Sequence, residues 1–225
     1  MEVHGHYWLP GEDFIPDELD GFIKENDELT KIFLNDELAI NEVCIKHGFS
    51  LLEKRKIPVL DLTKDLEQLW AEMDRKKRNA IRLAQKSNVK IRLAKPKDKI
   101  EFMDVYYHGY CIKHDDSAEH LNQVDSMTEK WIEREILYIA TLEIEMATGW
   151  GSKIIAGIKI DQSKFRTPGE IVYYSANASL PEYLKFRPND LLVWEAIQHS
   201  KKLGFKQFNM GGSIEHMFKK KFSKL

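Results

Sequence analysis

Residues 170–210 constrain the fold more than any other segment, because they read as a strand, a helix and a second strand. β-branched and aromatic residues predict strands over 170–179 and 206–210. The helix expected between them, over about 189–203, is apolar on nearly every side, which indicates burial. A crossover of this length most often joins two parallel strands with a right-handed connection. The chain is therefore expected to contain a parallel strand pair joined by a buried helix.

Two strong strand patterns precede this unit, over residues 135–145 and 153–161. The stretch "MATGWGS" between them contains two glycines and predicts an antiparallel hairpin. The other expected elements are short strands over 57–62 and 89–94, a long helix over 63–87 with Thr63 as its N-cap, and helices over 97–114, 126–135 and 214–222. Helices mixed with a mainly antiparallel sheet indicate an α+β domain.

The composition is that of an ordinary globular protein. Its 225 residues are 43% hydrophobic and 31% charged, and the net charge of −2 does not point to nucleic acid. Two cysteines exclude a disulfide framework and a cysteine-rich zinc site. No apolar run is long enough to span a bilayer, and the N-terminus lacks a secretion signal, so we expect a cytoplasmic protein.

Charge is unevenly distributed along the chain. Residues 1–45 are rich in acids and are expected to form an N-terminal extension with short helices, followed by a single domain over 46–225. Residues 75–95 contain bases and no acid. Helical spacing places four of these bases on one face, namely Arg75, Arg78, Arg82 and Lys86. This basic face could contact the phosphates of RNA, a nucleotide sugar or an anionic lipid, or it could be solvated or paired with local acids.

The beginning of the buried helix is a candidate anion site. Pro188 cannot extend a helix backwards, and Asn189 or Asp190 is a good N-cap. The free N–H groups of a helix N-terminus attract phosphates or oxyanions, and Arg187 adds charge. The alternative is that the cap satisfies these groups and that nothing binds there.

Paired glycines in "NMGGS" form a second candidate. Gly211 and Gly212 follow a strand, where they allow a sharp turn or a close approach to a ligand. The spacing of a phosphate-binding loop is absent, and so is the elbow motif of serine hydrolases. Histidines occur in "HGH" and "KHDDSAEH", but neither stretch has a recognised ligand set, so no metal site is predicted.

Several stretches together resemble the FemAB-type, or BioF2-like, branch of the GNAT acyltransferase superfamily. The first is a helix ending in an Arg-x-x-Ile-Arg-x-Ala pattern, here Arg78 to Ala84. It is followed by "RPNDLL", by "KKLGF", by a strand with a Gly-Gly pair and by "FKKKF". The similarity runs from about residue 57 to the end of the chain, and its specificity lies in the order and spacing of these pieces.

The resemblance implies a GNAT fold, in which the two central parallel strands are splayed apart, here 170–177 and 206–210. Relatives bind acyl-CoA or the acyl end of aminoacyl-tRNA along the splay, without a permanently bound cofactor. The FemAB branch attaches amino acids to the peptidoglycan stem peptide, and other members N-acylate amino sugars or peptides. The implied reaction is direct attack of an amine on the donor carbonyl, and the implied partners are a small-molecule or lipid-linked acceptor and tRNA.

The resemblance also implies roles for particular residues. The donor carbonyl would lie against the backbone of Tyr174 to Asn177, and Asn177, Ser213 and His216 would orient the amine or move a proton. The donor phosphate or carboxylate would be held by Arg187, Asn189, Asp190 and Leu191, beside Gly211 and Gly212. Arg78, Arg82 and Lys86 would face an anionic acceptor or tRNA.

One departure from the GNAT pattern concerns the donor. Ordinary GNAT enzymes carry a glycine-containing loop before the buried helix, whereas "YLKFRPND" contains no glycine. This favours aminoacyl-tRNA or an atypical donor over coenzyme A. It also leaves open a non-catalytic binding module on the same fold, which would recognise an anionic ligand through the basic face.

Overall fold

The computed structural model describes most of the chain from residue 58 onward. The described residues are 20, 24, 42, 45–48, 58–112, 118–146, 149–162, 170–211 and 221–222. The short helices predicted within 1–45 and the final helix predicted over 214–222 lie largely outside these residues. Residues 57–162 and 169–225 form one compact unit, and the elements below belong to it.

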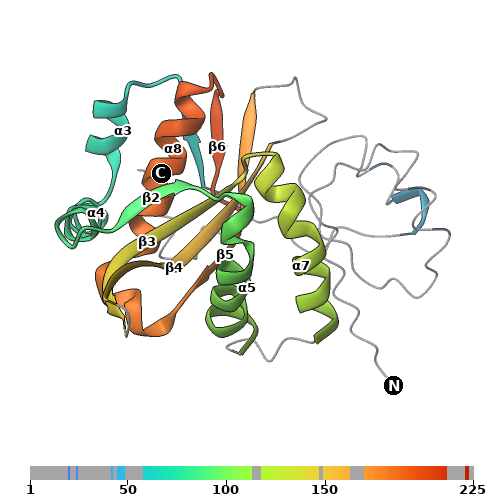
Figure 1. The fold of residues 1–225 in the computed structure, drawn as a ribbon. Coiled ribbons are helices and arrows are strands. Elements are labelled where there is room, and N and C mark those ends of the chain that lie inside the picture. The colour runs from blue at the N-terminus through green and yellow to red at the C-terminus, as the bar shows by residue number, and fades with distance from the viewer. Residues whose placement is uncertain are drawn as a thin grey trace. The chain divides into compact units, whose positions relative to one another are not determined.

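A six-stranded mixed sheet forms the centre of this unit (Figure 1). Its order is β1-β6-β5-β4-β3-β2, and all neighbours are antiparallel except β5 and β6. The strands are β1 (Val59–Asp61), β2 (Lys90–Leu93), β3 (Leu137–Met146), β4 (Gly149–Gln162), β5 (Ile171–Ser179) and β6 (Gln207–Asn209). The predicted α+β class and the predicted hairpin of β3 and β4 are both confirmed.

Helices cover both faces of the sheet (Figure 1). One face carries α3 (Leu66–Glu72), α4 (Arg75–Lys86) and α8 (Pro188–Lys202). The other carries α5 (Lys99–Tyr106), its π-helical continuation η2 (Tyr107–Cys111) and α7 (Ala118–Glu133). Short 3-10 turns, η1 (Pro96–Asp98) and η3 (Pro181–Phe186), connect these elements. Among the described residues, every helix is too short or too polar to cross a bilayer.

The long helix predicted over 63–87 is two helices, because the chain has a second strong N-cap. Asp65, rather than Thr63, caps α3, in a capping box with Gln68. Met73 is extended, and the side chain of Asp74 accepts a hydrogen bond from the backbone N–H of Lys76, which begins α4. Aspartate in a helix interior competes for backbone donors, and here that competition ends one helix and starts the next.

The parallel unit β5–α8–β6 is formed as the sequence predicts. Pairing between β5 and β6 runs only from Ile171 opposite Gln207 to Tyr173 opposite Asn209. β5 then continues to Ser179, while β6 ends at Asn209. We call this place, after Tyr173 and Asn209, the fork. It confirms the expected splay of the two parallel strands.

Candidate functional site

Beyond the fork, the described part of the chain that follows β6 stays beside β1. After Asn209, the N–H of Met210 donates to the carbonyl of Pro58 at 2.9 Å, so the chain stays with β1. Gly211 then adopts φ +59°, and its N–H donates to Asn209 Oδ1 at 2.8 Å. Within the described part of the chain, β5 has no strand neighbour on this side beyond Tyr173. A strand that continues beyond its last paired neighbour is a place where an extended ligand can lie alongside a sheet.

A β-bulge lies in β5 just beyond the fork. Lys159 pairs with Ala176 and Ile160 pairs with Tyr174, which leaves Ser175 as the extra residue. The Ser175 hydroxyl donates to the carbonyl of Lys159 at 3.2 Å. Bulges bend a strand and re-aim its groups, and they are common beside active sites. The backbone predicted to face the donor carbonyl is therefore irregular at that position.

Tyr174 and Asn177, the two predicted catalytic residues on β5, differ in environment. Tyr174 is buried against the α8 side of the sheet. Burial, and secondarily the charge of Asp190, raises the pKa of the Tyr174 hydroxyl, so this group stays protonated near neutral pH. Asn177 is exposed. Of the two side chains, only that of Asn177 is accessible to a ligand from solvent.

The beginning of α8 lies at the end of β5. Pro188 is the first helical residue, so the N-cap is Arg187 and the predicted caps Asn189 and Asp190 are wrong. Arg187 has φ +57°, and its side chain makes no cap hydrogen bond. Asn189 Oδ1 instead accepts a hydrogen bond from the Ser179 hydroxyl at 2.7 Å. The helix start is thus attached to the last residue of β5 and receives no cap from the Arg187 side chain.

Asp190 is engaged in a buried ion pair that the sequence analysis did not include. Its carboxylate accepts from the Lys77 ammonium at 2.5 Å, and each residue is only 6% exposed. The Lys77 ammonium also lies 4.8 Å from the centre of the Phe222 ring. Burial lowers the pKa of Lys77, the charges of Lys221 and Arg187 add to this effect, and Asp190 opposes it. Of the residues that the structure describes, three cations and one acid therefore converge on the start of α8.

Spacing could have identified Lys77 as an inward-facing residue. It lies four residues before Ile81, which is fully buried on the apolar stripe of α4. A lysine on such a stripe is a signal of a buried partner, because a buried ammonium is unfavourable without an acid. The identity of that partner, on another helix, had no local signal.

The predicted basic face of α4 is used in part to hold α3. Arg78 donates to the carbonyls of Trp70 at 3.3 Å and Ala71 at 2.8 Å, at the end of α3. The Arg82 guanidinium lies 5.3 Å from the centre of the Trp70 ring and donates to Asn79. Lys86 is exposed in the last turn of α4. A structural role for Arg78 is thus present, and ligand binding by this face stays a prediction.

The remaining predicted site residues divide into two groups. Leu191 is 3% exposed and its side chain belongs to the core, so it could contribute to a site only through its backbone. Gly212, Ser213 and His216 lie outside the described residues, and their roles stay predictions.

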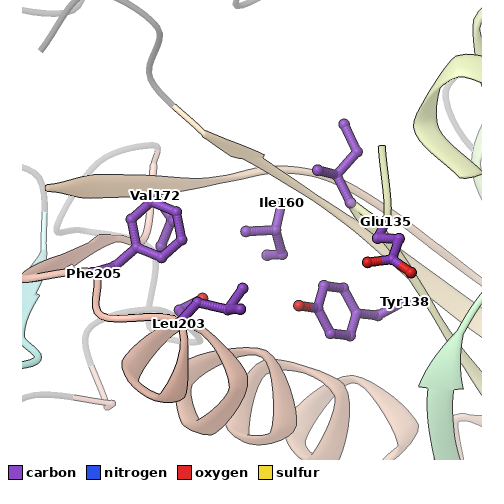
Figure 2. Close-up of a pocket in the computed structure, with 8 residues that line it drawn as sticks. Glu135, Tyr138, Ile160, Val172, Leu203 and Phe205 are labelled. Atoms are coloured by element: carbon purple, nitrogen blue, oxygen red, sulfur yellow. The ribbon is translucent and has the colours of Figure 1, made fainter. Parts of the chain in front are cut away.

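A small cavity lies near the last turn of α8, at the opposite end of the helix from Pro188 (Figure 2). Its volume is about 10 Å³, which is room for about one water molecule. Figure 2 shows Val172, Ile160, Phe205 and Leu203 around it, with Tyr138 at its edge. The Tyr138 hydroxyl hydrogen-bonds His199 Nδ1 at 2.6 Å, and burial raises its pKa to about 12. This cavity is too small for any acyl donor.

Comparisons with known proteins agree with this geometry. The profile of the family described as "Acetyltransferase (GNAT) domain" matches residues 165–220, which contain β5, α8 and β6. The structure of FemX superposes with a TM-score of 0.58 and 12% identity, over 88% of this chain and 68% of that one. The C-terminal domain of an Agrobacterium fabrum protein, described as a putative lysylphosphatidylglycerol synthetase, superposes with a TM-score of 0.60 and 14% identity. This superposition covers 93% of this chain and 70% of that one. No curated protein sequence matches significantly.

Proposed function

From the premise that this chain has the GNAT fold, in the form shared with FemX, we propose that it is an acyltransferase. It would transfer an acyl or aminoacyl group from acyl-CoA or aminoacyl-tRNA to an amine. The observation that carries this proposal is the fork, where the described pairing of β5 with β6 ends and β5 leads to a helix start that no Arg187 side-chain bond caps. We place the protein in the cytoplasm, where both donors are made.

The fork suits an elongated donor with an anionic end. An extended arm would lie along β5 beyond the fork, as an added strand would. Its phosphate would face the N–H groups of Asn189 to Leu191, with Arg187 beside it. The missing glycine loop has a counterpart here, because Arg187 itself adopts the left-handed conformation that glycine would favour. Coenzyme A and aminoacyl-tRNA therefore both remain donor candidates.

The proposed reaction depends on positioning the acceptor amine against the donor carbonyl, and it uses no nucleophilic side chain of the protein. The acceptor nitrogen attacks the donor carbonyl and forms the new amide bond. The carbon–sulfur or carbon–oxygen ester bond breaks, and the thiolate or the ribose alkoxide leaves with the electron pair. The proton lost by the amine passes through a base to the leaving group or to solvent. Backbone N–H groups at the bulge would stabilise the oxyanion, and Asn177 would orient the amine.

Support for the acceptor class comes from the branch that the chain resembles. FemAB-type enzymes modify peptidoglycan precursors, and a protein described as a lysylphosphatidylglycerol synthetase shares the fold. We therefore propose an amine of a cell-wall precursor, an amino sugar or a peptide as acceptor, free or lipid-linked. Ser213 and His216 are proposed to act in proton transfer, and Gly211 and Gly212 to let the backbone approach the donor.

Binding and turnover with defined donors test this proposal. Acetyl-CoA or aminoacyl-tRNA should raise the melting temperature, since a ligand that binds only the folded state stabilises it. Replacing Arg187 with Gln should weaken binding of that donor about tenfold by removing a cation beside the phosphate. Lys185→Gln, an exposed charge change two residues away, is the matched control and should have little effect.

The outcomes separate the two candidate functions. Stabilisation by a donor together with amide formation on an added amine supports the transferase. Binding without turnover over a panel of amines would favour the non-catalytic module. Failure of both donors to bind would contradict the proposal as a whole.

A further inference from the structure

The buried Lys77–Asp190 pair presents an electrostatic problem at the proposed donor site. Asp190 lies in the first turn of α8, where its negative charge would oppose an anionic donor at the same helix end. Its carboxylate is buried, so solvent screens this charge poorly. An unpaired Asp190 would therefore cancel much of the attraction that the helix start and Arg187 provide.

The position of Lys77 resolves this conflict. Its ammonium contacts Asp190 at 2.5 Å from the first turn of α4, on the neighbouring helix. Among the described residues, the other charges that bear on Lys77 are those of Arg187 and Lys221, which are both positive. With Asp190 neutralised by Lys77, these two described cations remain at the corner.

We propose that Lys77 is a positioning residue for the donor, acting through Asp190 to keep the start of α8 electropositive. This inference rests on the proposed function and names a residue that neither the sequence motifs nor the fold assigns to it. The pair also joins α4 to α8. Lys221 is held at the same corner by a second contact, in which the N–H of Asp74 donates to its carbonyl at 2.9 Å. On this proposal, the contact between α4 and α8 also sets the affinity for the donor.

The two members of the pair should affect donor binding in opposite directions. Lys77→Met leaves Asp190 unpaired and should weaken coenzyme A binding about tenfold, the size expected of one poorly screened charge roughly 10 Å away. Asp190→Asn leaves Lys77 cationic and should bind coenzyme A as tightly as the wild type or more tightly. The double variant Lys77→Met/Asp190→Asn should return to near wild-type affinity. Calorimetric titration with coenzyme A, repeated with aminoacyl-tRNA, measures these constants.

An ion pair at the far edge of the sheet provides the matched control. Arg92 of β2 donates two hydrogen bonds to the buried Asp98 carboxylate, at 2.6 and 2.8 Å, and β2 is the edge strand farthest from β6 and β1. Arg92→Met should lower the melting temperature, as Lys77→Met does, and leave donor affinity unchanged.

Each outcome of this experiment is informative. If Lys77→Met and Asp190→Asn weaken binding alike, the pair is only a structural clamp and the inference is wrong. If Lys77→Met does not fold, Asp190→Asn and the double variant still show whether removing the negative charge of Asp190 raises or lowers donor affinity. If the wild type binds neither coenzyme A nor aminoacyl-tRNA, the proposed function itself fails and the inference fails with it.

Discussion

Arg187 combines backbone strain with a position at the proposed donor site. Its φ of +57° costs a residue with a β-carbon about 1–2 kcal/mol relative to glycine. Positive φ at a non-glycine residue is often retained where a side chain is needed for function. Glycine would adopt the backbone conformation of this position with less strain, so we infer that arginine is present there because its guanidinium has a function.

Replacing Arg187 with Gly should therefore separate stability from binding. Relief of strain, offset by the freer unfolded chain, should raise the free energy of unfolding by a few tenths to about 1 kcal/mol. Donor affinity should fall as in Arg187→Gln. Glu135→Gly, at φ +54° at the other end of α8, is the control and should stabilise without changing affinity. Urea unfolding and calorimetry measure the two effects; an Arg187→Gly variant that binds the donor normally would contradict the role of the guanidinium.

Asp98 should make the stability of the protein depend on acid pH. Both oxygens of its buried carboxylate accept from Arg92, at 2.6 and 2.8 Å, and Arg92 lowers the pKa of Asp98 below its usual 3.8. A lowered folded-state pKa stabilises the protein above the unfolded pKa, and this contribution is lost as pH falls through the folded value. Asp98→Asn should cost about 1.5–3 kcal/mol at pH 7, and the difference from the wild type should narrow below about pH 4.

Urea unfolding at several pH values checks this expectation. Asp125→Asn is the control, because that carboxylate is half-exposed and pairs with Lys99 at 3.3 Å, so the cost should be below about 0.5 kcal/mol. A difference between Asp98→Asn and the wild type that stayed constant down to pH 3 would show that charge is not the cause.

Among the elements, the π-helical segment η2 is held against β5 by a glycine. A β-carbon at Gly109 would lie 2.5 Å from the backbone oxygen of Ser179, the residue that hydrogen-bonds Asn189 at the start of α8. π-helical turns are rare and are frequent at functional sites. This contact connects the α5 side of the sheet to the helix end on which the donor proposal rests.

Gly109→Ala should consequently affect both stability and the donor site. The added methyl group must displace backbone, so we expect a cost of about 3 kcal/mol and weaker donor binding through movement of Ser179. Ile112→Ala, which shortens an exposed side chain just after η2, should change neither quantity appreciably. The measurements are denaturant unfolding and donor titration. Unchanged stability of the alanine variant would mean that η2 can move away from β5 freely.

The sequence predicts helices and strands well where the hydrophobic pattern and the segment length agree. It predicts them less well where a contact with a distant part of the chain determines where an element ends. The apolar helix pattern between two strand patterns correctly predicted the β5–α8–β6 unit, and the glycines between two strand patterns correctly predicted the β3–β4 hairpin. The break at Asp74 was missed because an apolar stripe runs across it, while the N–H of Asp74 is satisfied by Lys221, far away in sequence. The π-helical turn at η2 has no signature in hydrophobic spacing.

The candidate site was predictable in position but less so in chemistry. The start of α8 and the strand edge at Asn177 follow from topology. The N-cap was assigned wrongly, because Asn189 and Asp190 have the right chemistry but Pro188 already occupies the first helical position. Side chains with two possible partners, such as Arg78, could not be assigned without the position of α3.

Considered as a whole molecule, the compact unit has two apolar cores separated by one sheet. Ile155 belongs to the core beneath α8, and Ile139 to the core beneath α5 and α7. Both residues are fully buried, on neighbouring strands that pair along most of their length. Since β3 and β4 contribute to both cores, we expect the two cores to unfold together.

Shortening the side chain of Ile155 or of Ile139 should therefore lower the midpoint temperature of a single unfolding transition that both cores share. Ile155→Val and Ile139→Val should each cost about 1 kcal/mol, and the double variant about the sum of the two, because the side chains face opposite cores. Ile100→Val, at a position 85% exposed, is the control and should be neutral. Calorimetry and far-UV circular dichroism should give coincident single transitions. Two resolved transitions in any variant would show that the cores unfold independently.

The fork has a consequence for how this protein behaves in a cell. Among the described residues, β6 pairs with β5 over three residues, and β5 continues for six more. On the proposed function, the donor would lie along this continuation and add its contacts to the folded state only while it is bound. Rigidity, resistance to proteolysis and lifetime would then follow the supply of activated acyl groups, so that the folded state itself reports metabolic state.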